Sequence, residues 1–354
     1  MRLLLIAGYD HPANQGGVST FNRNLINIFK ENLYTITYFT EKKKIYSNIY
    51  ENLIEIYRIK YFYKRIDRKF LNFKIQKFLL NRKVKKINPE ICIINNPKDL
   101  SALKNIKKKK ILVQHMDYQT SLKLYFDNKK KKMQKIFNKE IDLFICLSEY
   151  DKQRFSIELG VNEEKFKVIR HISQIEILKE VKKKNKELIM IARLENFQKR
   201  FDLAIRAMKK LPDFILRIYG DGNIQVLKNI IEENKLTNVF LYGATNNVKE
   251  KLDMAGIFIM TSDYEGYPIS TIEAMRRGLP IILRDTFDSA KDIVKNNGVL
   301  LEKEWNEDKF VEAVKNIYND YEYYSENSKE LGKRYDFSKI KDEWKKIIEL
   351  EGIK

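Results

Sequence analysis

The feature that most constrains the fold is an alternation of apolar, strand-like runs with amphipathic helices, and it occurs twice along the chain. In the first half the runs cover residues 3–8, 35–39, 90–94, 110–115, 142–147 and 166–169. In the second half they cover residues 188–192, 214–219, 239–243 and 256–260. Continuous apolar strands separated by helices are typical of parallel sheets, because the crossover helices cover both faces. The sequence therefore predicts an α/β fold with two parallel-sheet domains and a cleft between them.

A polar, charged segment separates the two halves. Residues 173–186 lack strong periodicity, and we interpret them as a hinge. With 354 residues, the chain is long enough for two domains that each bury a core. We predict an N-terminal domain over 1–172, a C-terminal domain over 187–335, and a final helical region over 336–354.

The chain shows no targeting or membrane-spanning pattern. No apolar run approaches the roughly 18 residues that a membrane span needs. The apolar part of the N-terminal MRLLLIAGYD is too short for a signal peptide and predicts a buried strand. The two cysteines, Cys92 and Cys146, have no partner at metal-ligand spacing. These features predict a cytoplasmic protein with reduced thiols.

Positive charge is concentrated in one region. Residues 58–140 contain 25 Lys/Arg and 6 Asp/Glu, so this region has nearly the whole net charge of +20. A bias towards lysine codons would spread the excess along the chain, so we favour a basic face for anionic lipid head groups or a phosphorylated acceptor. Within this region, residues 66–86 predict a basic helix that contains Phe70, Phe73, Lys77 and Leu80. Its rings could rest on a membrane or pack on the domain core.

The stretch 261–282, TSDYEGYPISTIEAMRRGLPII, places Glu265 and Glu273 on either side of a strand-to-helix turn. The unpaired amides at a helix N-terminus suit phosphate, and carboxylates suit sugar or ribose hydroxyls. We interpret the stretch as a nucleotide-sugar pocket. Ser270 precedes Glu273 by three residues, so the spacing by itself favours a capping box in which both satisfy the helix's own amides.

Further polar and glycine residues lie where predicted strands end. Arg193 and Lys199 flank a loop in which fixed cations would stabilise the charge that grows on a diphosphate leaving group. Gly16 and Gly17 could bring backbone amides close to a phosphate, although turn glycines are the simpler interpretation. His115 ends a strand, and ligands bind at the carboxyl ends of strands in open α/β sheets. A structural or solvated histidine is the alternative.

Together these motifs resemble a retaining GT-B glycosyltransferase of family 4. The matching positions are the Gly16-Gly17 loop, His115, Ser148-Glu149, Ala192-Arg193-Leu194 with Lys199, Tyr219-Gly220-Asp221-Gly222, and Glu265 through Pro280. The resemblance implies two Rossmann-like parallel-sheet domains that face each other across a deep cleft, and a C-terminal helix within 336–354 that crosses back to the first domain. The chain departs from the family at His171-Ile172-Ser173, where Asn-Gly is frequent, at the bulky Phe197, and at Arg200, where glycine is usual.

The resemblance also implies roles for individual residues. Arg193 and Lys199 would hold the donor diphosphate, and Glu273 would bind the ribose hydroxyls. Glu265 would contact the transferred sugar, and His115 would lie near the reacting carbon. The remaining donor-binding residues would be Gly16, Gly17, Gly220, Gly266, Tyr267, Ile269 and Ser270.

The implied reaction moves a sugar, with retention of anomeric configuration, from a nucleotide diphosphate to a saccharide or lipid-linked acceptor in bacterial surface polysaccharide synthesis. UDP-sugars are the expected donors, with GDP- and ADP-sugars as alternatives, and no metal or other cofactor is expected. We expect the protein to be peripheral at the inner membrane face through residues 58–140. The alternatives are a GT-B sugar-nucleotide epimerase and a basic nucleic-acid-binding protein. No recognised nucleic-acid motif occurs, so no nucleic acid partner is expected.

Overall fold

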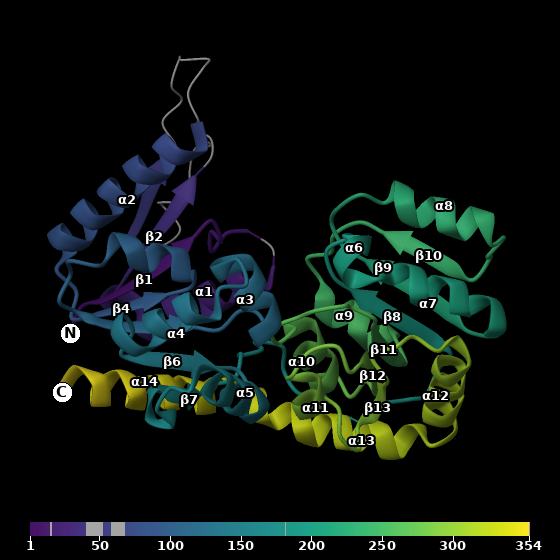
Figure 1. The fold of residues 1–354 in the computed structure, drawn as a ribbon. Helices are drawn as coiled ribbons and strands as arrows, with labels where there is room; N and C mark the ends of the chain where they lie inside the picture. Colours follow the sequence, from purple (N-terminus) through teal and green to yellow (C-terminus); the bar gives the residue numbers. More distant parts are fainter. Residues whose placement is uncertain (15, 40–51, 58–67, 181, 354) are drawn as a thin grey trace. The chain divides into compact units, whose positions relative to one another are not determined.

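The computed structural model describes residues 1–14, 16–39, 52–57, 68–180 and 182–353. The chain forms two compact units (Figure 1). Unit 1 comprises Met1–Leu147, Lys152–Ile169 and Lys341–Lys354, and unit 2 comprises Ser148–Asp151 and Arg170–Ile340. The main passages of the chain between them therefore lie after Ile169 and after Ile340.

Unit 1 is built on a seven-stranded sheet with the order β3-β2-β1-β4-β5-β6-β7. Its strands are β1 (Leu3–Gly8), β2 (Leu33–Phe39), β3 (Leu53–Tyr57), β4 (Ile91–Ile94), β5 (Lys109–Val113), β6 (Leu143–Cys146) and β7 (Phe166–Val168). All neighbouring strands pair in parallel, so their carboxyl ends share one edge of the sheet.

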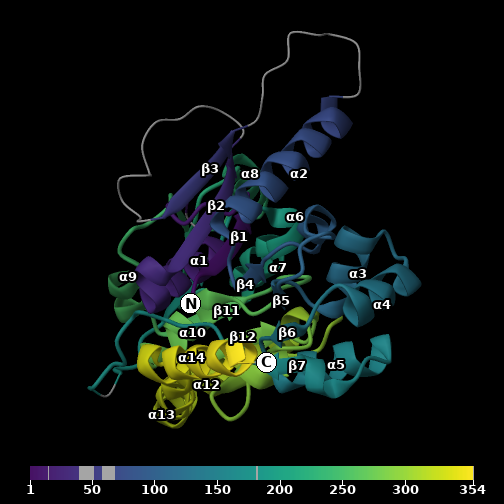
Figure 2. The same ribbon diagram turned by 90° about the vertical axis from the view of Figure 1, so that its left-hand side faces the viewer.

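The helices of unit 1 connect these strands and cover the sheet. They are α1 (Gly17–Phe29), α2 (Arg68–Ile87), α3 (Tyr118–Phe126), α4 (Lys130–Lys139) and α5 (Glu149–Leu159), with 3-10 turns η1 (Lys30–Asn32), η2 (Pro97–Ala102) and η3 (Glu163–Lys165). Helices α3 and α4 lie side by side (Figure 2). Every residue of the central strands β1 and β4 is buried, which explains their continuous apolar sequences. Cys92 and Cys146 are buried, free cysteines.

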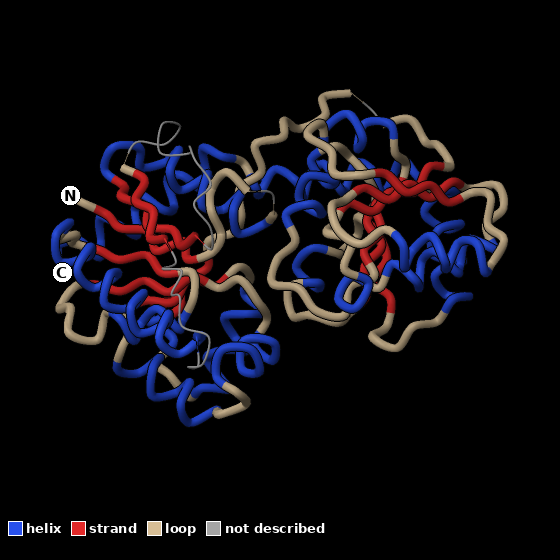
Figure 3. Tube along the Cα trace, turned by 90° about the horizontal axis from the view of Figure 1, so that it is seen from above, coloured by secondary structure: helices blue, strands red, loops and turns tan. Residues whose placement is uncertain are grey.

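Unit 2 is built on a six-stranded parallel sheet with the order β10-β9-β8-β11-β12-β13. Its strands are β8 (Glu187–Ile191), β9 (Ile215–Tyr219), β10 (Val239–Tyr242), β11 (Ile257–Met260), β12 (Ile281–Arg284) and β13 (Gly298–Leu301). In Figure 3 the strands of each unit lie together as one red sheet with blue helices around it. The predicted α/β class with two parallel sheets is confirmed, although the sequence analysis did not predict β3, β12 or β13.

The helices of unit 2 lie between its strands, except for α12 and α13, which follow the last strand β13. They are α6 (Asn196–Lys199), α7 (Phe201–Ala207), α8 (Gln225–Glu233), α9 (Val248–Met254), α10 (Ile269–Arg276), α11 (Ala290–Ile293), α12 (Glu307–Asn319) and α13 (Tyr321–Gly332), with 3-10 turns η4 (Met208–Lys210) and η5 (Lys333–Tyr335). Helices α10 and α13 are neighbours (Figure 1).

The last helix, α14 (Phe337–Ile353), begins in unit 2, and its residues from Lys341 onward belong to unit 1. Within unit 1, the buried Trp344 packs against Phe21 of α1, with ring centroids 6.1 Å apart. In α14, Ile340, Trp344 and Ile348 are buried, and Ile347 is partly buried.

The segment 173–186 contains no helix or strand among its described residues. It is nevertheless held on unit 2. The Nε of Arg276 donates to the Ile175 carbonyl at 2.5 Å, and the Nζ of the buried Lys182 donates to the Leu252 carbonyl at 2.8 Å. The predicted hinge is therefore an anchored segment rather than a free linker.

The predicted basic helix 66–86 corresponds to α2, which runs from Arg68 to Ile87. Residues 66 and 67 and the side chains of Phe70 and Phe73 lie outside the described part of the structure. Leu80 is fully buried, so this part of the helix packs its apolar face on the core. Among the residues that the structure describes, no helix combines the length and apolarity that crossing a membrane requires.

Candidate functional site

Two loops of unit 2 follow the neighbouring strands β8 and β11 and are bonded to each other. Gln198 connects the 192–200 loop to the 261–268 loop, because its Nε2 donates to the Tyr264 carbonyl at 3.0 Å. The carbonyl of Gln198 accepts from the Asp263 amide at 2.8 Å. Gln198 is buried and was not predicted, since no motif marks it. The two loops thus form one wall at the carboxyl edge of the sheet.

Lys199 and Glu265, predicted separately as catalytic residues, are in direct contact in this wall. The Lys199 Nζ lies 2.5 Å from the Glu265 Oε1, and the two side chains are 11% and 10% exposed. A charge-assisted hydrogen bond with so little solvent is stronger than a surface pair, and loss of either partner leaves the other charge buried. The sequence predicted both residues but not their contact.

Arg193 occupies a different environment on the same loop. Its Nη1 lies 2.8 Å from the Glu195 Oε1, but the two side chains are 58% and 52% exposed. An exposed pair contributes little stability, so the guanidinium can exchange partners at small cost. Phe197, noted as an unusual bulky residue, projects into solvent from the same loop.

Arg200 shows why a glycine is usual at its position. Its backbone is left-handed, with φ 49° and ψ 44°, a conformation that glycine adopts without a steric cost. The side chain compensates through two hydrogen bonds of 3.1 Å to Asp202 and one of 3.3 Å to Asp263. These bonds, chiefly that to Asp202, raise the pKa of Arg200.

The helix α10 begins directly after the 261–268 loop, at Ile269. Its N-cap residue is Pro268, which has no side-chain capping bond, and Ser270 is already the second helical residue. The capping-box interpretation is therefore wrong, because the serine does not occupy the N-cap position. Glu273 lies a further turn into the helix and is partly exposed.

The side chain of Tyr267 is directed into unit 2, where it is 4% exposed. Its hydroxyl lies 3.0 Å from the Asp292 Oδ2 and also hydrogen-bonds to the Tyr335 hydroxyl. Burial raises the pKa of Tyr267 well above its usual value. Any contact of Tyr267 with a ligand at the surface of this loop is therefore left to its backbone.

Gly220 has a structural role at the end of β9. A Cβ atom there would lie 1.9 Å from the carbonyl oxygen of Ala192, just after the adjacent β8. Only glycine permits this approach of the two strand ends. This close approach is sufficient to explain the glycine, and no contact with a ligand is needed to explain it.

In unit 1, Gly16 is the N-cap of α1, with φ 126° and ψ 161°. Apart from Gly16 and its two chain neighbours, no atom of the described residues lies within 4 Å of a Cβ built at Gly16, so the backbone conformation is what demands glycine. The helix begins at Gly17, so the Gly16-Gly17 pair is itself the helix entry. Arg23, which was not predicted, stabilises the loop before α1, because its Nη1 donates to the Pro12 carbonyl at 2.6 Å.

His115 lies two residues beyond the end of β5 and is partly buried. Its ring packs edge-on against Phe21, with centroids 5.1 Å apart and an interplanar angle of 72°. Phe21 is on α1, the helix that begins at Gly17. The structure thus places His115 beside this helix, near the carboxyl edge of the unit 1 sheet.

Comparison with known proteins assigns the chain to a family. Residues 15–171 match the family described as Glycosyltransferase Family 4, and residues 173–334 match Glycosyl transferases group 1. The chain is a group 1 glycosyltransferase of GT-B type. The family resemblance expected from the motifs is thereby confirmed.

Relatives of this glycosyltransferase include the Escherichia coli O-antigen biosynthesis glycosyltransferase WbnH, 26% identical over 212 residues, or 58% of this chain and 60% of WbnH. The poly(glycerol-phosphate) alpha-glucosyltransferase of Bacillus subtilis is 29% identical over 169 residues, or 44% of this chain and 24% of that enzyme. The alignments therefore span less than two thirds of the length of either relative.

Solved structures confirm the GT-B fold of this glycosyltransferase. The lipopolysaccharide outer core galactosyltransferase WaaB matches with a TM-score of 0.73 and 19% identity, covering 98% of this chain and 99% of WaaB. Anabaena HepE in complex with UDP and glucose matches with a TM-score of 0.77 and 14% identity, covering 99% of each chain.

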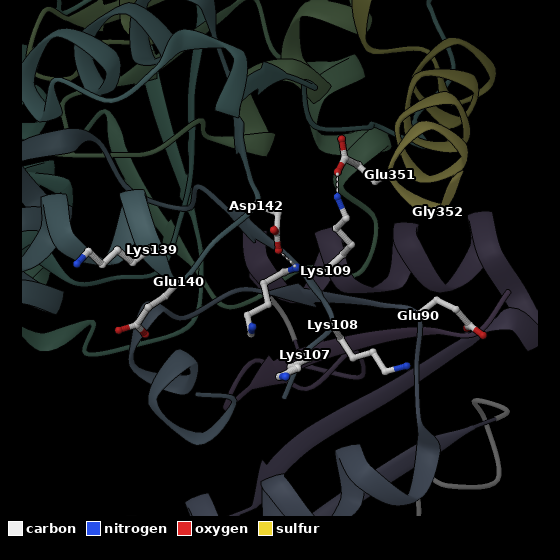
Figure 4. Close-up of a pocket in the computed structure, with 10 residues that line it drawn as sticks. Glu90, Lys107, Lys108, Lys109, Lys139, Glu140, Asp142, Glu351 and Gly352 are labelled. Atoms are coloured by element: carbon white, nitrogen blue, oxygen red, sulfur yellow. Dashed lines mark hydrogen bonds and ion pairs between the residues drawn. The ribbon is translucent and has the colours of Figure 1, made fainter. Parts of the chain in front are cut away.

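The glycosyltransferase also has a surface pocket of about 520 Å³ that contains none of the predicted site residues. It lies at the amino ends of β4, β5 and β6, opposite the edge that holds His115. Figure 4 shows the residues that line it. Its charged lining residues are Glu90, Lys107, Lys108, Lys109, Lys110, Lys139, Glu140, Asp142 and Glu351. Three of the acids are engaged: Glu90 accepts from the Arg2 amide at 2.5 Å, Asp142 accepts from the Lys110 amide at 2.8 Å, and Glu351 pairs with Lys109 at 3.4 Å.

Proposed function

We propose that this group 1 glycosyltransferase moves a sugar from a nucleotide diphosphate to a saccharide or lipid-linked acceptor during synthesis of a bacterial surface polysaccharide. The observation that carries the proposal is the buried contact between Lys199 and Glu265 beside the start of α10. It combines a cation suited to a diphosphate, a carboxylate suited to sugar hydroxyls, and a helix N-terminus suited to phosphate.

The functions for which the relatives are named support the proposed substrate classes. WbnH is named for O-antigen biosynthesis, and the Bacillus subtilis relative for glucosyl transfer to poly(glycerol phosphate). The HepE structure contains UDP and glucose. We therefore propose that this chain uses a nucleotide-sugar donor, with UDP as the first candidate nucleotide. The proposed acceptor is a glycan or a polyol phosphate.

In the proposed mechanism, Lys199 turns from Glu265 to the donor diphosphate, and Arg193 leaves Glu195 to join it. Their charges stabilise the leaving group without a metal. Glu265 then accepts hydrogen bonds from the sugar hydroxyls, and Glu273 from the ribose. The acceptor hydroxyl attacks the face from which the diphosphate departs, and its proton passes to the departing phosphate oxygen, so configuration is retained.

The remaining predicted contacts are backbone groups. The amides at the start of α10, at Ile269 and Ser270, would bind the distal phosphate. Gly16 and Gly17 would offer the amides of the α1 entry to the donor from unit 1. His115 would hold the sugar near the reacting carbon. Gly266 would contribute its amide to the sugar site, while Gly220 would shape the wall through its close approach to Ala192.

We also propose that the basic region docks on anionic lipid at the inner membrane face. Exposed cations of unit 1 lie on α2, before β5 and on α4: Arg82, Lys83, Lys85, Lys86, Lys104, Lys107, Lys131, Lys132, Lys135 and Lys139. Each lysine near an anionic surface contributes about 1 kcal/mol. Flotation with phosphatidylglycerol vesicles should recover the protein at low salt, and no recovery would contradict the docking.

The function is tested by offering UDP-, GDP- and ADP-sugars with oligosaccharide and poly(glycerol phosphate) acceptors. We expect mass spectrometry to detect a glycosylated acceptor and NMR to show the donor's anomeric configuration in the product. An epimerised donor formed without any acceptor would support the epimerase instead. An inverted product would contradict retention, and no reaction with any donor would contradict the proposal.

A further inference from the structure

A buried polar cluster of unit 2 is centred on Asp292, a residue that no motif marks. Its Oδ2 accepts from the Tyr267 hydroxyl at 3.0 Å and from the Arg170 Nε at 3.0 Å. Its Oδ1 accepts from the Arg170 Nη2 at 3.2 Å. Tyr335 completes the cluster through its hydrogen bond to Tyr267. Asp292, Tyr267 and Tyr335 are 5%, 4% and 1% exposed, so these three side chains are almost free of solvent.

The members of this cluster come from separated parts of the chain. Arg170 is the first residue after the chain leaves unit 1. Tyr335 ends η5, shortly before the chain returns to unit 1 after Ile340. Tyr267 follows Glu265 by two residues in the 261–268 loop. The Asp292 carboxylate therefore connects this loop to the first passage through Arg170, and the Tyr267 hydroxyl connects the loop to the second passage through Tyr335.

Ser289, three residues before Asp292, also holds the backbone of the 261–268 loop. The Ser289 hydroxyl donates to the Gly266 carbonyl at 2.5 Å, and the Ser289 carbonyl accepts from the Asp292 amide at 3.0 Å. Consecutive loop residues are thus fixed, Gly266 by its carbonyl and Tyr267 by its side chain. Helix α10 begins two residues later, so the cluster fixes the position from which its first amides project.

Stability alone gives a weak reason for such a cluster. Two buried tyrosine hydroxyls and an ion pair must be desolvated, and apolar side chains of similar volume would fill the space without that cost. The neighbouring His171 packs edge-on against Tyr267, and burial lowers its pKa to about 4, so it is uncharged near neutral pH. The cations that face Asp292 are therefore Arg170 and, at 4.0 Å, Arg334.

We propose that Asp292 is a positioning residue: through Tyr267 it fixes the 261–268 loop and the start of α10 in the geometry that sugar transfer requires. This inference rests on the proposed function, because it assigns the loop to the donor sugar. Asp292 acts through Tyr267 and touches no reacting atom.

The test compares Asp292→Asn and Tyr267→Phe with Glu187→Gln. Glu187 forms a matched control pair with Arg217, which is 25% exposed where Arg170 is 24%. The control pair lies at the start of β8, away from the carboxyl edge of the sheet. Tyr267→Phe removes only a hydroxyl and remains informative if Asp292→Asn fails to fold.

Hydrogen exchange of the full-length protein gives a readout that does not depend on activity. In Asp292→Asn and Tyr267→Phe we expect the amides of residues 264–272 to exchange at least about tenfold faster, which corresponds to easier local opening. In Glu187→Gln their exchange should stay within about threefold of wild type. Equal protection of this segment in all three variants would overturn the inference.

Kinetics give the second readout. A misplaced reacting group costs up to about 100-fold in rate, so Asp292→Asn and Tyr267→Phe should lower kcat at least about tenfold, while Glu187→Gln changes it less than about threefold. Losses of kcat that merely follow each variant's loss of Tm would overturn the positioning role. If wild type transfers no sugar, the proposed function fails, and hydrogen exchange still decides whether Asp292 fixes the loop.

Discussion

Replacing Glu265 by glutamine should tighten the binding of UDP and at the same time slow sugar transfer. In the unliganded protein the Lys199 ammonium is held 2.5 Å from the Glu265 carboxylate, with about a tenth of each side chain exposed. A diphosphate must compete with this carboxylate for the ammonium. Glutamine keeps the size of the side chain but removes the competing charge.

The magnitude follows from the burial of the pair. A hydrogen bond to a charged group contributes about 1.5–3 kcal/mol, and about 1.4 kcal/mol corresponds to a tenfold change in affinity. Glu265→Gln should therefore bind UDP about tenfold more tightly. Loss of the carboxylate contact to the sugar should lower kcat by about 100-fold, the scale of removing one such polar contact in a transition state.

The assay is isothermal titration of UDP into wild type, Glu265→Gln and the control Glu195→Gln. The Arg193–Glu195 pair is more than half exposed and contributes at most about 1 kcal/mol, so the control should change UDP affinity by less than about fivefold. Glu265→Gln leaves Lys199 without its buried counter-charge, so the Tm of this variant should be lower than that of wild type. UDP should raise the Tm of the variant more than it raises the Tm of wild type. Unchanged or weaker binding of UDP by Glu265→Gln would refute the assignment of Lys199 to the diphosphate.

Three further predictions concern stability. Arg200→Ala should unfold in denaturant about 1 kcal/mol more easily than Arg200→Gly, because the left-handed backbone with φ 49° suits only glycine; equal midpoints would contradict this. Burial lowers the pKa of Lys182 from 10.5 to about 8. Between pH 8 and 10.5 the unfolded chain therefore binds one proton more than the folded chain at Lys182. As the pH rises through this range, the free energy of unfolding of wild type should increase by up to about 3 kcal/mol relative to that of Lys182→Met. Denaturant unfolding at several pH values measures this difference, and parallel pH profiles of the two proteins would disprove it. Burial likewise lowers the pKa of His171 to about 4, so wild type should lose stability relative to His171→Phe as pH falls from 6.5 towards 4, and a difference independent of pH would argue against this.

The sheets were largely predictable because their strands are buried on both faces. Continuous apolar runs predicted β1 and β9 to within one residue. The strand β3, LIEIY, was missed because its Glu55 interrupts the apolar run at the edge of the sheet. Helix starts were less predictable, since Gly17 and Ile269 begin helices without a capping side chain.

The sequence singled out individual candidate residues but not the arrangement in which the fold places them. The motif spacing predicted Lys199 and Glu265, while their contact depends on two loops that meet only in the folded sheet. Gln198 and Asp292 were missed because each is a single polar residue whose role comes from tertiary contacts. The left-handed backbone at Arg200 was foreshadowed in the sequence, because glycine is usual at that position in the family. That substitution by itself did not predict the backbone conformation.

The central claim, that unit 2 binds a nucleotide sugar through its strand-end cations, is tested most directly by a thermal-shift screen of UDP-, GDP-, ADP- and CMP-sugars. Each donor is offered to wild type and to Arg193→Ala, a variant expected to fold normally because Arg193 is more than half exposed. A donor present at about 100 times its Kd stabilises the folded protein by about 2.7 kcal/mol. We predict that at least one donor raises the Tm of wild type and has a clearly smaller effect on Arg193→Ala. A screen in which no donor shifts wild type, or in which both proteins shift equally, would contradict the claim.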